Sequence, residues 1–174
     1  MATLSIGIGE MCVSSRPDDE IVALGLGSCV AIVLYDRRTT TVGAIHAMLP
    51  TRKGLRDSDG ERPGRYVDEG LEKLFEMMRV RTGHGTRLAC ALVGGAAMFE
   101  FTGPSNLDIG KNNVKMSQEL LRHFGIPILA SDIGGNQGRS VTVVVGGAVV
   151  HVRTVGAQKP LVSLAQGNRA RAAA

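Results

Sequence analysis

Residues 24–49 read LGLGSCVAIVLYDRRTTTVGAIHAML, and the predicted architecture follows from this stretch. It contains two apolar runs rich in β-branched residues, Cys29–Tyr35 and Val42–Leu49, on either side of the polar sequence DRRTTT. Short apolar runs that flank a polar segment are typical of two antiparallel strands joined by a turn. The stretch therefore predicts a β-hairpin.

The register of this hairpin places a cysteine and a histidine on one face of the sheet. A symmetric loop of even length pairs Tyr35 with Val42. The same register pairs Cys29 with Met48. Because side chains two residues apart share a face, Cys29 and His46 become diagonal neighbours, roughly 7–8 Å apart at the backbone. A single-residue bulge would put them on opposite faces, so this prediction depends on the register.

The residues before Cys29 favour a sharp, exposed turn. Gly25, Gly27 and Ser28 precede it, and glycines let the backbone turn tightly. Backbone N–H groups at such a turn can stabilise the oxyanion of a tetrahedral intermediate, and a histidine can accept the thiol proton near neutral pH. The residues alone leave two other interpretations open: Cys29 as a small buried apolar residue, and His46 as an ordinary strand histidine.

The remaining sequence contains further strand-like runs and two helical segments. Runs bounded by Gly, Pro or Asp predict strands at Ser5–Val13, Ile21–Leu24, Arg87–Val93, Ile126–Ala130, Val141–Val145 and Val149–Val155. Apolar residues at steps of three and four predict helices around Val67–Met78 and Val114–Phe124. Between the last two strands, Gly146-Gly147 predicts a two-residue hairpin turn. So many strands require at least one large sheet.

Length and composition favour one soluble domain. The chain has 174 residues, of which 44% are hydrophobic and 21% charged. We expect the domain to cover residues 1–158 and a partly disordered tail to follow at 159–174. No run reaches the roughly 18 apolar residues of a membrane span, and the first ten residues lack the features of a secretory signal. We therefore expect no membrane insertion and a cytoplasmic location.

Cysteine, histidine and charge content argue against several kinds of site. Three cysteines, widely separated, do not suit a disulfide framework or a paired-cysteine zinc site, and no two histidines have the spacing of a helix-borne metal site. We therefore expect no metal. The net charge is +4, but part of the excess lies near the C-terminus and the chain has no Trp, two Tyr and four Phe. Because stacking platforms are scarce, nucleic acid is not an expected partner.

The motifs around Cys29 and His46 belong to a series of short motifs along the chain. In order, the series is GLGSCV (25–30), HAMLP (46–50), PGRY with Asp68 (63–68), GGAAMF (94–99), IG with Asn113 (109–113), GGN (134–136) and RS (139–140). Together these motifs closely resemble the CheD family of chemoreceptor glutamine deamidases. The resemblance covers roughly residues 5–155.

The resemblance implies both a fold and a reaction. The fold is α/β: a single compact domain, built as a layered α/β/β sandwich with mainly antiparallel or mixed strands and two main helices. The reaction converts glutamine side chains of methyl-accepting chemotaxis receptors to glutamate, and some members also hydrolyse glutamate methyl esters. By this resemblance Cys29 attacks the amide carbon to form a thioester, and His46 accepts and returns the proton. Gly27 and Ser28 lie at the oxyanion turn, and no cofactor is needed.

One position departs from the family pattern. The family usually has a threonine six residues before the cysteine, where it helps to orient the histidine, and this chain has Ala23. A methyl group cannot accept a hydrogen bond. Either a backbone carbonyl or a hydroxyl such as that of Ser28 orients His46, or the activity is reduced.

The resemblance leaves groove residues and partners open. Met98, Phe99 and Asn113 either line a substrate groove or fill structural positions. Members of the family also bind a CheC-type phosphatase, which would compete with the receptor for the groove near Cys29. The alternative function is a catalytically weak or inactive regulatory module that binds such a phosphatase or the receptor, and Ala23 is the residue that motivates it. A weaker third interpretation is a redox-sensing thiol.

Overall fold

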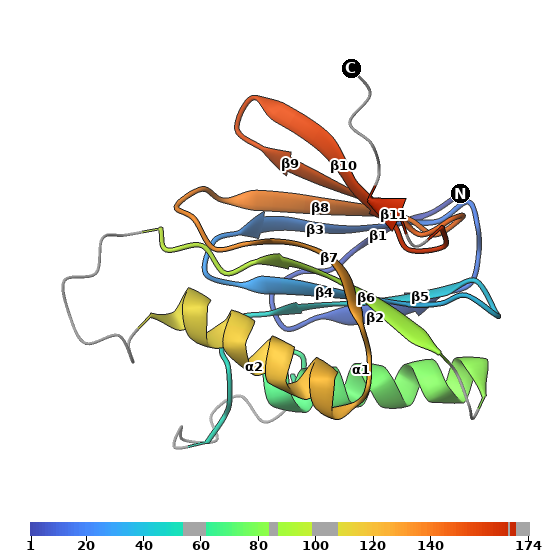
Figure 1. Ribbon diagram of the computed structural model, residues 1–174, viewed down its shortest axis with the longest axis horizontal. Coiled ribbons are helices and arrows are strands. Elements are labelled where there is room, and N and C mark those ends of the chain that lie inside the picture. The colour runs from blue at the N-terminus through green and yellow to red at the C-terminus, as the bar shows by residue number, and fades with distance from the viewer. Residues whose placement is uncertain (54–61, 84–86, 99–107, 167, 170–174) are drawn as a thin grey trace.

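Two β-sheets pack face to face, and two helices cover the outer face of one of them (Figure 1). The computed structural model describes residues 1–53, 62–83, 87–98, 108–166 and 168–169, and all counts of elements refer to these residues. The three layers are therefore helices, a five-stranded sheet and a six-stranded sheet. This arrangement confirms the layered α/β/β sandwich with mixed strands and two main helices.

The five-stranded sheet forms the middle layer. Its strands lie in the order β2 (Met11–Ser14), β5 (Thr41–Ala47), β4 (Val30–Asp36), β6 (Leu88–Gly94) and β7 (Ile128–Ile133). β4 is antiparallel to both of its neighbours, whereas β6 and β7 are parallel. Every residue of β4 and β5 is buried, because these strands have layers on both faces. Tyr35 pairs with Val42, which confirms the predicted hairpin register.

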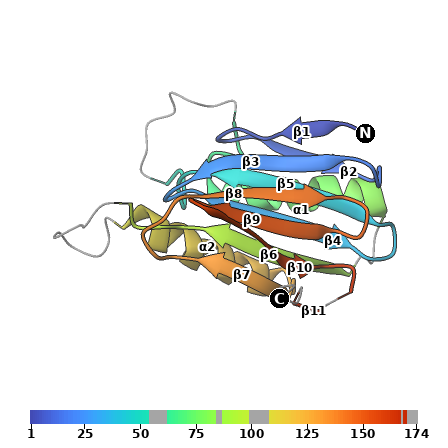
Figure 2. The same cartoon turned by 90° about the horizontal axis from the view of Figure 1, so that it is seen from above.

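The six-stranded sheet forms the third layer, and its strands run in directions similar to those of the middle sheet when seen from above (Figure 2). Its order is β1 (Thr3–Ser5), β3 (Glu20–Leu26), β8 (Arg139–Val144), β9 (Val149–Thr154), β10 (Ala157–Ser163) and β11 (Asn168–Arg169). The predicted β8–β9 hairpin is confirmed, but its strands are joined by four residues, 145–148, and not by two; Ala148 N donates to Val145 O at 3.0 Å across the turn. The positive φ angles are those of Gly147 and Ala148, at 89° and 47°.

Two hydrophobic cores separate the layers. One lies between the sheets and includes the buried valines of β8 and β9. The other lies between the middle sheet and the helices α1 (Val67–Thr82) and α2 (Ile109–His123). The predicted apolar stripe of α1, from Val67 to Met78, is buried in this second core. Neither helix in the described part of the chain is long and apolar enough to cross a membrane.

Several boundaries differ from the sequence-based expectation, and two of the differences change the description of the fold. The segment predicted as one strand, Ser5–Val13, instead contributes to β1 in one sheet and to β2 in the other, with Ile6–Glu10 crossing between the layers. The expected domain end at residue 158 falls inside β10, which pairs with β9 along its length. Val162 and Leu164 are fully buried, so the sheet and its core extend beyond that residue. Residues 170–174 of the expected tail lie outside the described residues.

Candidate active site

The hairpin of β4 and β5 places Cys29 and His46 on the same face of the middle sheet. Ala31 pairs with His46 across the hairpin, and Cys29 lies two residues before Ala31. The side chains of Cys29, Ala31 and Ala44 belong to the core between the sheets. His46 follows Ala44 by two residues and therefore faces the same layer. The two residues singled out by the sequence thus share a face, as the predicted register requires.

The His46 ring is buried and held by a backbone carbonyl. Only 2% of its surface is exposed, and its Nδ1 atom lies 3.4 Å from the carbonyl oxygen of Ile6. A carbonyl can only accept a hydrogen bond, so Nδ1 carries the proton and Nε2 of the neutral ring is the basic nitrogen. Within the described residues Nε2 is buried without a hydrogen-bond partner. The ring therefore presents an unused lone pair inside the layer that contains Cys29.

Burial controls the protonation of both groups. It raises the pKa of the Cys29 thiol above its ordinary value, and a hydrogen bond from its own backbone N–H offsets only part of this effect. Burial lowers the pKa of His46, against smaller opposite effects of the Ile6 carbonyl and the Glu10 charge. At neutral pH the resting pair is consequently a thiol and a neutral imidazole. Cys29 retains 7% exposure, whereas Cys90 in the other core is completely buried.

The turn before Cys29 is fixed to its surroundings through its carbonyl groups. Gly27 O accepts from Ala96 N and Cys29 O from Gly95 N, both at 2.8 Å. In the described structure, the N–H groups of Ser28 and Cys29 make no hydrogen bond to another backbone group. The carbonyls of Gly27 and Cys29 are thus held by the residues that follow β6, and the assignment of Gly27 and Ser28 to an oxyanion turn stays a prediction.

Asn113 connects the two strands that carry the candidate pair. Its side-chain amide on α2 donates to Ser28 O, next to Cys29, and to Met48 O, two residues after His46, both at 2.9 Å. Two carbonyl partners fix the orientation of the amide, because a flip would place oxygen against oxygen. Asn113 is completely buried. Its position therefore fits the structural alternative and not the lining of a substrate groove.

Met98 and Phe99 are the other two predicted groove residues. Met98 is about half exposed and lies over the turn, since a Cβ on Gly27 would be 3.0 Å from Met98 Cγ. It also lines a surface pocket of ≈ 470 Å³ beside Gly25 and Gly27. Phe99 lies outside the described residues. Met98 accordingly stays a predicted groove residue.

Ala23 is the position that departs from the family pattern, and the neighbouring Ile6 supplies a carbonyl group to the His46 ring. Ala23 is a buried residue of β3 that faces the core between the sheets. Ile6 N donates to Val22 O at 2.8 Å, so Ile6 lies beside Ala23, and the Ile6 carbonyl is the group next to the His46 ring. This arrangement corresponds to the backbone-carbonyl alternative. The sequence carries no signal for it, because every residue has a carbonyl group.

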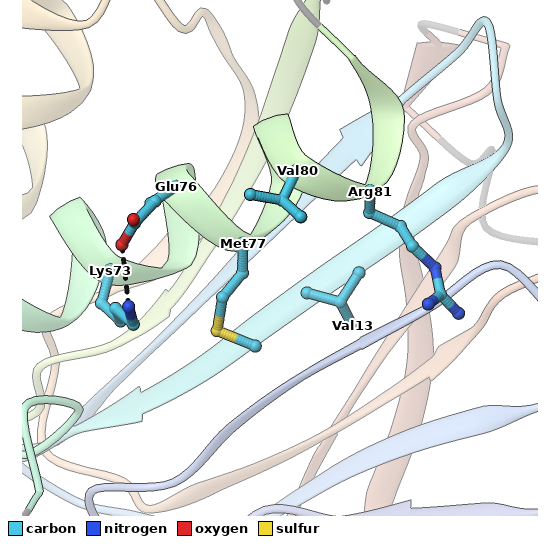
Figure 3. A pocket seen from close by; sticks show the side chains of 6 residues that line it. All are labelled: Val13, Lys73, Glu76, Met77, Val80 and Arg81. Carbon is cyan, nitrogen blue, oxygen red and sulfur yellow. Dashed lines mark hydrogen bonds and ion pairs between the residues drawn. The ribbon is translucent and has the colours of Figure 1, made fainter.

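A second surface pocket lies in a different layer. It has a volume of ≈ 320 Å³ between α1 and β2 and is lined by Val13, Lys73, Glu76, Met77, Val80 and Arg81 (Figure 3). Lys73 and Glu76 form an ion pair of 2.8 Å there. Its lining residues among those that the structure describes include no thiol and no imidazole, so this pocket is not a candidate for the same chemistry. Among the described residues, no cluster of His, Cys, Asp and Glu is suited to hold a metal ion.

Comparison with known proteins gives consistent matches. The sequence profile of the family described as "CheD chemotactic sensory transduction" matches residues 48–154. The "Chemoreceptor glutamine deamidase CheD" of Thermotoga maritima is 39% identical over 156 residues, covering 90% of this chain and 94% of that protein. The "Probable chemoreceptor glutamine deamidase CheD" of Methanosarcina barkeri is 39% identical over 150 residues, covering 86% of this chain and 95% of that protein.

A relative from Clostridium tetani, also named "Probable chemoreceptor glutamine deamidase CheD", is 34% identical over 152 residues. That match covers 87% of this chain and 90% of the relative. The profile match begins after Cys29 and His46, so it does not bear on them. The match to the Thermotoga maritima protein leaves at most 18 residues of this chain unaligned, and therefore includes both positions.

Proposed function

The chain belongs to the CheD family, and we propose that it is a chemoreceptor glutamine deamidase in which Cys29 is the nucleophile and His46 the general base. The observation that carries the proposal is the shared face of these two residues, with the unpartnered Nε2 of His46 in the same layer as the thiol. The names of the relatives give the substrate class: glutamine side chains of chemoreceptors. The receptor segments that carry these glutamines are cytoplasmic, so we propose that the protein acts in the cytoplasm.

The first half of the reaction forms a thioester. Cys29 Sγ attacks the amide carbon of the glutamine side chain while its proton moves to His46 Nε2. Since the resting pair is uncharged, this proton transfer accompanies the attack and does not precede it. The amide oxygen becomes an oxyanion, and the N–H groups of Ser28 and Cys29 are the proposed donors to it.

The second half releases glutamate. Protonated His46 is a good acid because burial lowers its pKa, and it gives its proton to the departing nitrogen, which leaves as ammonia. Water then attacks the thioester carbonyl with His46 again as base, and cleavage of the C–S bond returns the thiol. The sum is glutamine plus water giving glutamate plus ammonia. No redox partner enters this balance.

Ammonia release from a purified receptor fragment tests the proposal. We expect stoichiometric release with the natural protein and none above background with Cys29→Ala. Cys12→Ala is the matched control, because it removes a thiol from the neighbouring strand β2, where burial and Asp19 raise the thiol pKa to about 11. Equal release by the natural protein and Cys29→Ala would rule out the enzyme.

A regulatory binding module is the second candidate function. It is favoured by the 7% exposure of Cys29 and by the absence of a hydroxyl at Ala23. In this case the protein binds a receptor fragment or a CheC-type phosphatase without turnover. Binding measured in parallel with ammonia release separates the two functions, because a module retains binding when both the natural protein and Cys29→Ala release only background ammonia.

A further inference from the structure

The pocket beside the candidate active site contains an arginine without a partner among the described residues. The pocket has a volume of ≈ 470 Å³ and is bounded by Gly27 of the turn before Cys29, by Met98, by Arg139 and Arg153 from the six-stranded sheet, and by Val155, which follows β9. A volume of this size is ample for one or two side chains of a bound polypeptide. Val155 is 94% exposed, so the pocket rim is partly apolar.

Arg139 and Arg153 differ in their surroundings. Arg139 is buried, and its Nε lies 2.8 Å from Asp132 Oδ1. Lys159 Nζ lies 3.4 Å from the other oxygen of the same carboxylate. Asp132 is thus shared by two cations. Arg153 is exposed, and no described residue makes a hydrogen bond or ion pair with its guanidinium. The pocket therefore has an excess of positive charge and one complete set of unused donors.

Strand pairing relates Arg153 to the end of β3, where the turn before Cys29 begins. Arg153 pairs with Ser140 of β8, and Ser140 Oγ accepts from Gly25 N at 3.4 Å, so one row of residues crosses from the turn to Arg153. Two strand spacings place the Arg153 backbone about 10 Å from the end of β3. Arg153 and Gly27 line the same pocket, so a polypeptide segment bound in this pocket lies beside the turn that precedes Cys29.

We propose that Arg153 is a specificity-determining residue that binds a carboxylate of the protein substrate, carried by a residue close to the target glutamine. The guanidinium offers a planar pair of donors that matches a carboxylate. Met98 and Val155 contact the apolar side chains on either side of that residue. This inference rests on the proposed function and specifies its substrate: glutamines with an acidic neighbour.

A pair of synthetic peptides tests the assignment. Both contain one target glutamine from a receptor; one has glutamate beside it, and the other has glutamine in place of that glutamate. Binding is measured by fluorescence anisotropy with Cys29→Ala protein, so that turnover does not interfere. We expect the acidic peptide to bind about fivefold more tightly, as for a partly exposed ion pair, and Arg153→Gln to abolish the preference. Arg153→Lys should keep part of it.

Arg87→Gln is the matched control. Arg87 is also exposed, and its replacement by Gln removes the same charge. It directly precedes β6, whereas Gly94 lies at the other end of this strand. In the active protein, Arg153→Gln should raise KM for the acidic peptide about fivefold and leave kcat unchanged. An unchanged preference in Arg153→Gln, or an equal loss in Arg87→Gln, would overturn the assignment. If the protein preferred the acidic peptide but released no ammonia, the subsite would be supported and only the proposed deamidase activity would be ruled out.

Discussion

The Nδ1 atom of His46 lies 3.4 Å from the carbonyl oxygen of Ile6, which is at the long end of the range for a hydrogen bond. Ile6 reaches this position because the chain crosses there from one sheet to the other, and Ile6 N is bonded to Val22 O. The ring therefore has one weak acceptor on its Nδ1 side. Ala23, next in the strand to Val22, offers no second one.

A hydroxyl at position 23 should strengthen the orientation of His46. We expect Ala23→Ser to raise kcat/KM about fivefold, the effect of one additional hydrogen bond. Because an acceptor at Nδ1 stabilises the protonated ring, the pKa of His46 should rise, and the acid limb of the pH–rate profile should move to higher pH. Initial rates of ammonia release between pH 5 and 9 give both kcat/KM and the position of the acid limb. An unchanged profile would show that the Ile6 carbonyl suffices.

The second prediction concerns the close approach of β6 to the turn before Cys29. A Cβ on Gly94, where φ is +113°, would lie 2.3 Å from Cys29 O, so Gly94→Ala must displace the turn. We expect a loss of about 3 kcal/mol or more in the free energy of unfolding and a loss of activity. The control is Gly125→Ala, where φ is +69° and a Cβ would meet no atom within 4 Å among the described residues, apart from its two chain neighbours.

Comparing the two glycine variants isolates the effect of the close contact between a Cβ at position 94 and Cys29 O. Gly125→Ala carries only the cost of a left-handed backbone, about 1–2 kcal/mol, and should leave kcat unchanged. Urea unfolding gives the stability of each variant and ammonia release gives its activity. Similar stability losses, with activity retained in Gly94→Ala, would mean that the turn tolerates displacement.

The third prediction concerns the connection made by Asn113. Asn113→Ala removes both donors to Ser28 O and Met48 O and should cost about 2–3 kcal/mol of stability. It should also lower kcat more than it changes KM, because the connection positions Cys29 relative to His46 and not the substrate. Ser117→Ala is the control, since Ser117 is equally buried one turn later and its hydroxyl, within the described part of the chain, bonds only to Asn113 O, at 2.7 Å. A similar loss of kcat in both variants would contradict a positioning role.

The sequence predicts elements whose partners are close along the chain. The β4–β5 register follows from a symmetric loop, and the β8–β9 hairpin from Gly146-Gly147 between alternating valines. Both helices follow from their apolar spacing. In each case local geometry and burial point to the same structure.

Features that depend on distant partners are not predictable in this way. An apolar run containing Gly7 and Gly9 does not reveal where the chain changes sheets, and so neither the Ile6 carbonyl nor its contact with His46 has a sequence signal. The sequence does not predict β10, because Pro160 interrupts its strand pattern; the structure accommodates it with a register shift before Val162. The partners of Asn113 are backbone carbonyls, which no motif identifies.

The last prediction is the pH dependence that follows from two opposite pKa shifts. Burial lowers the pKa of His46 below 6.5 and raises that of Cys29 above 9.0, so the neutral pair persists over a wide range. We expect the rise of kcat/KM with pH to have its midpoint below 6.5 and the profile then to stay level through about pH 8. Alkylation of Cys29 by iodoacetamide should increase with a midpoint above pH 9.0, in His46→Gln as well.

The same shifts act on stability with defined signs. Between the folded pKa of His46 and 6.5, the unfolded chain binds more protons than the folded one, so the free energy of unfolding falls as the pH drops through this window. Above pH 9.0 the unfolded chain loses the Cys29 proton first, and stability falls as the pH rises. Urea titrations of the natural protein and of His46→Gln measure the free energy of unfolding below pH 6.5. In this range the free energy should depend less on pH in His46→Gln. If an alkylation midpoint well below pH 9.0 shifted upward in His46→Gln, the resting pair would instead be a thiolate and an imidazolium, and the attack would not require concurrent proton transfer.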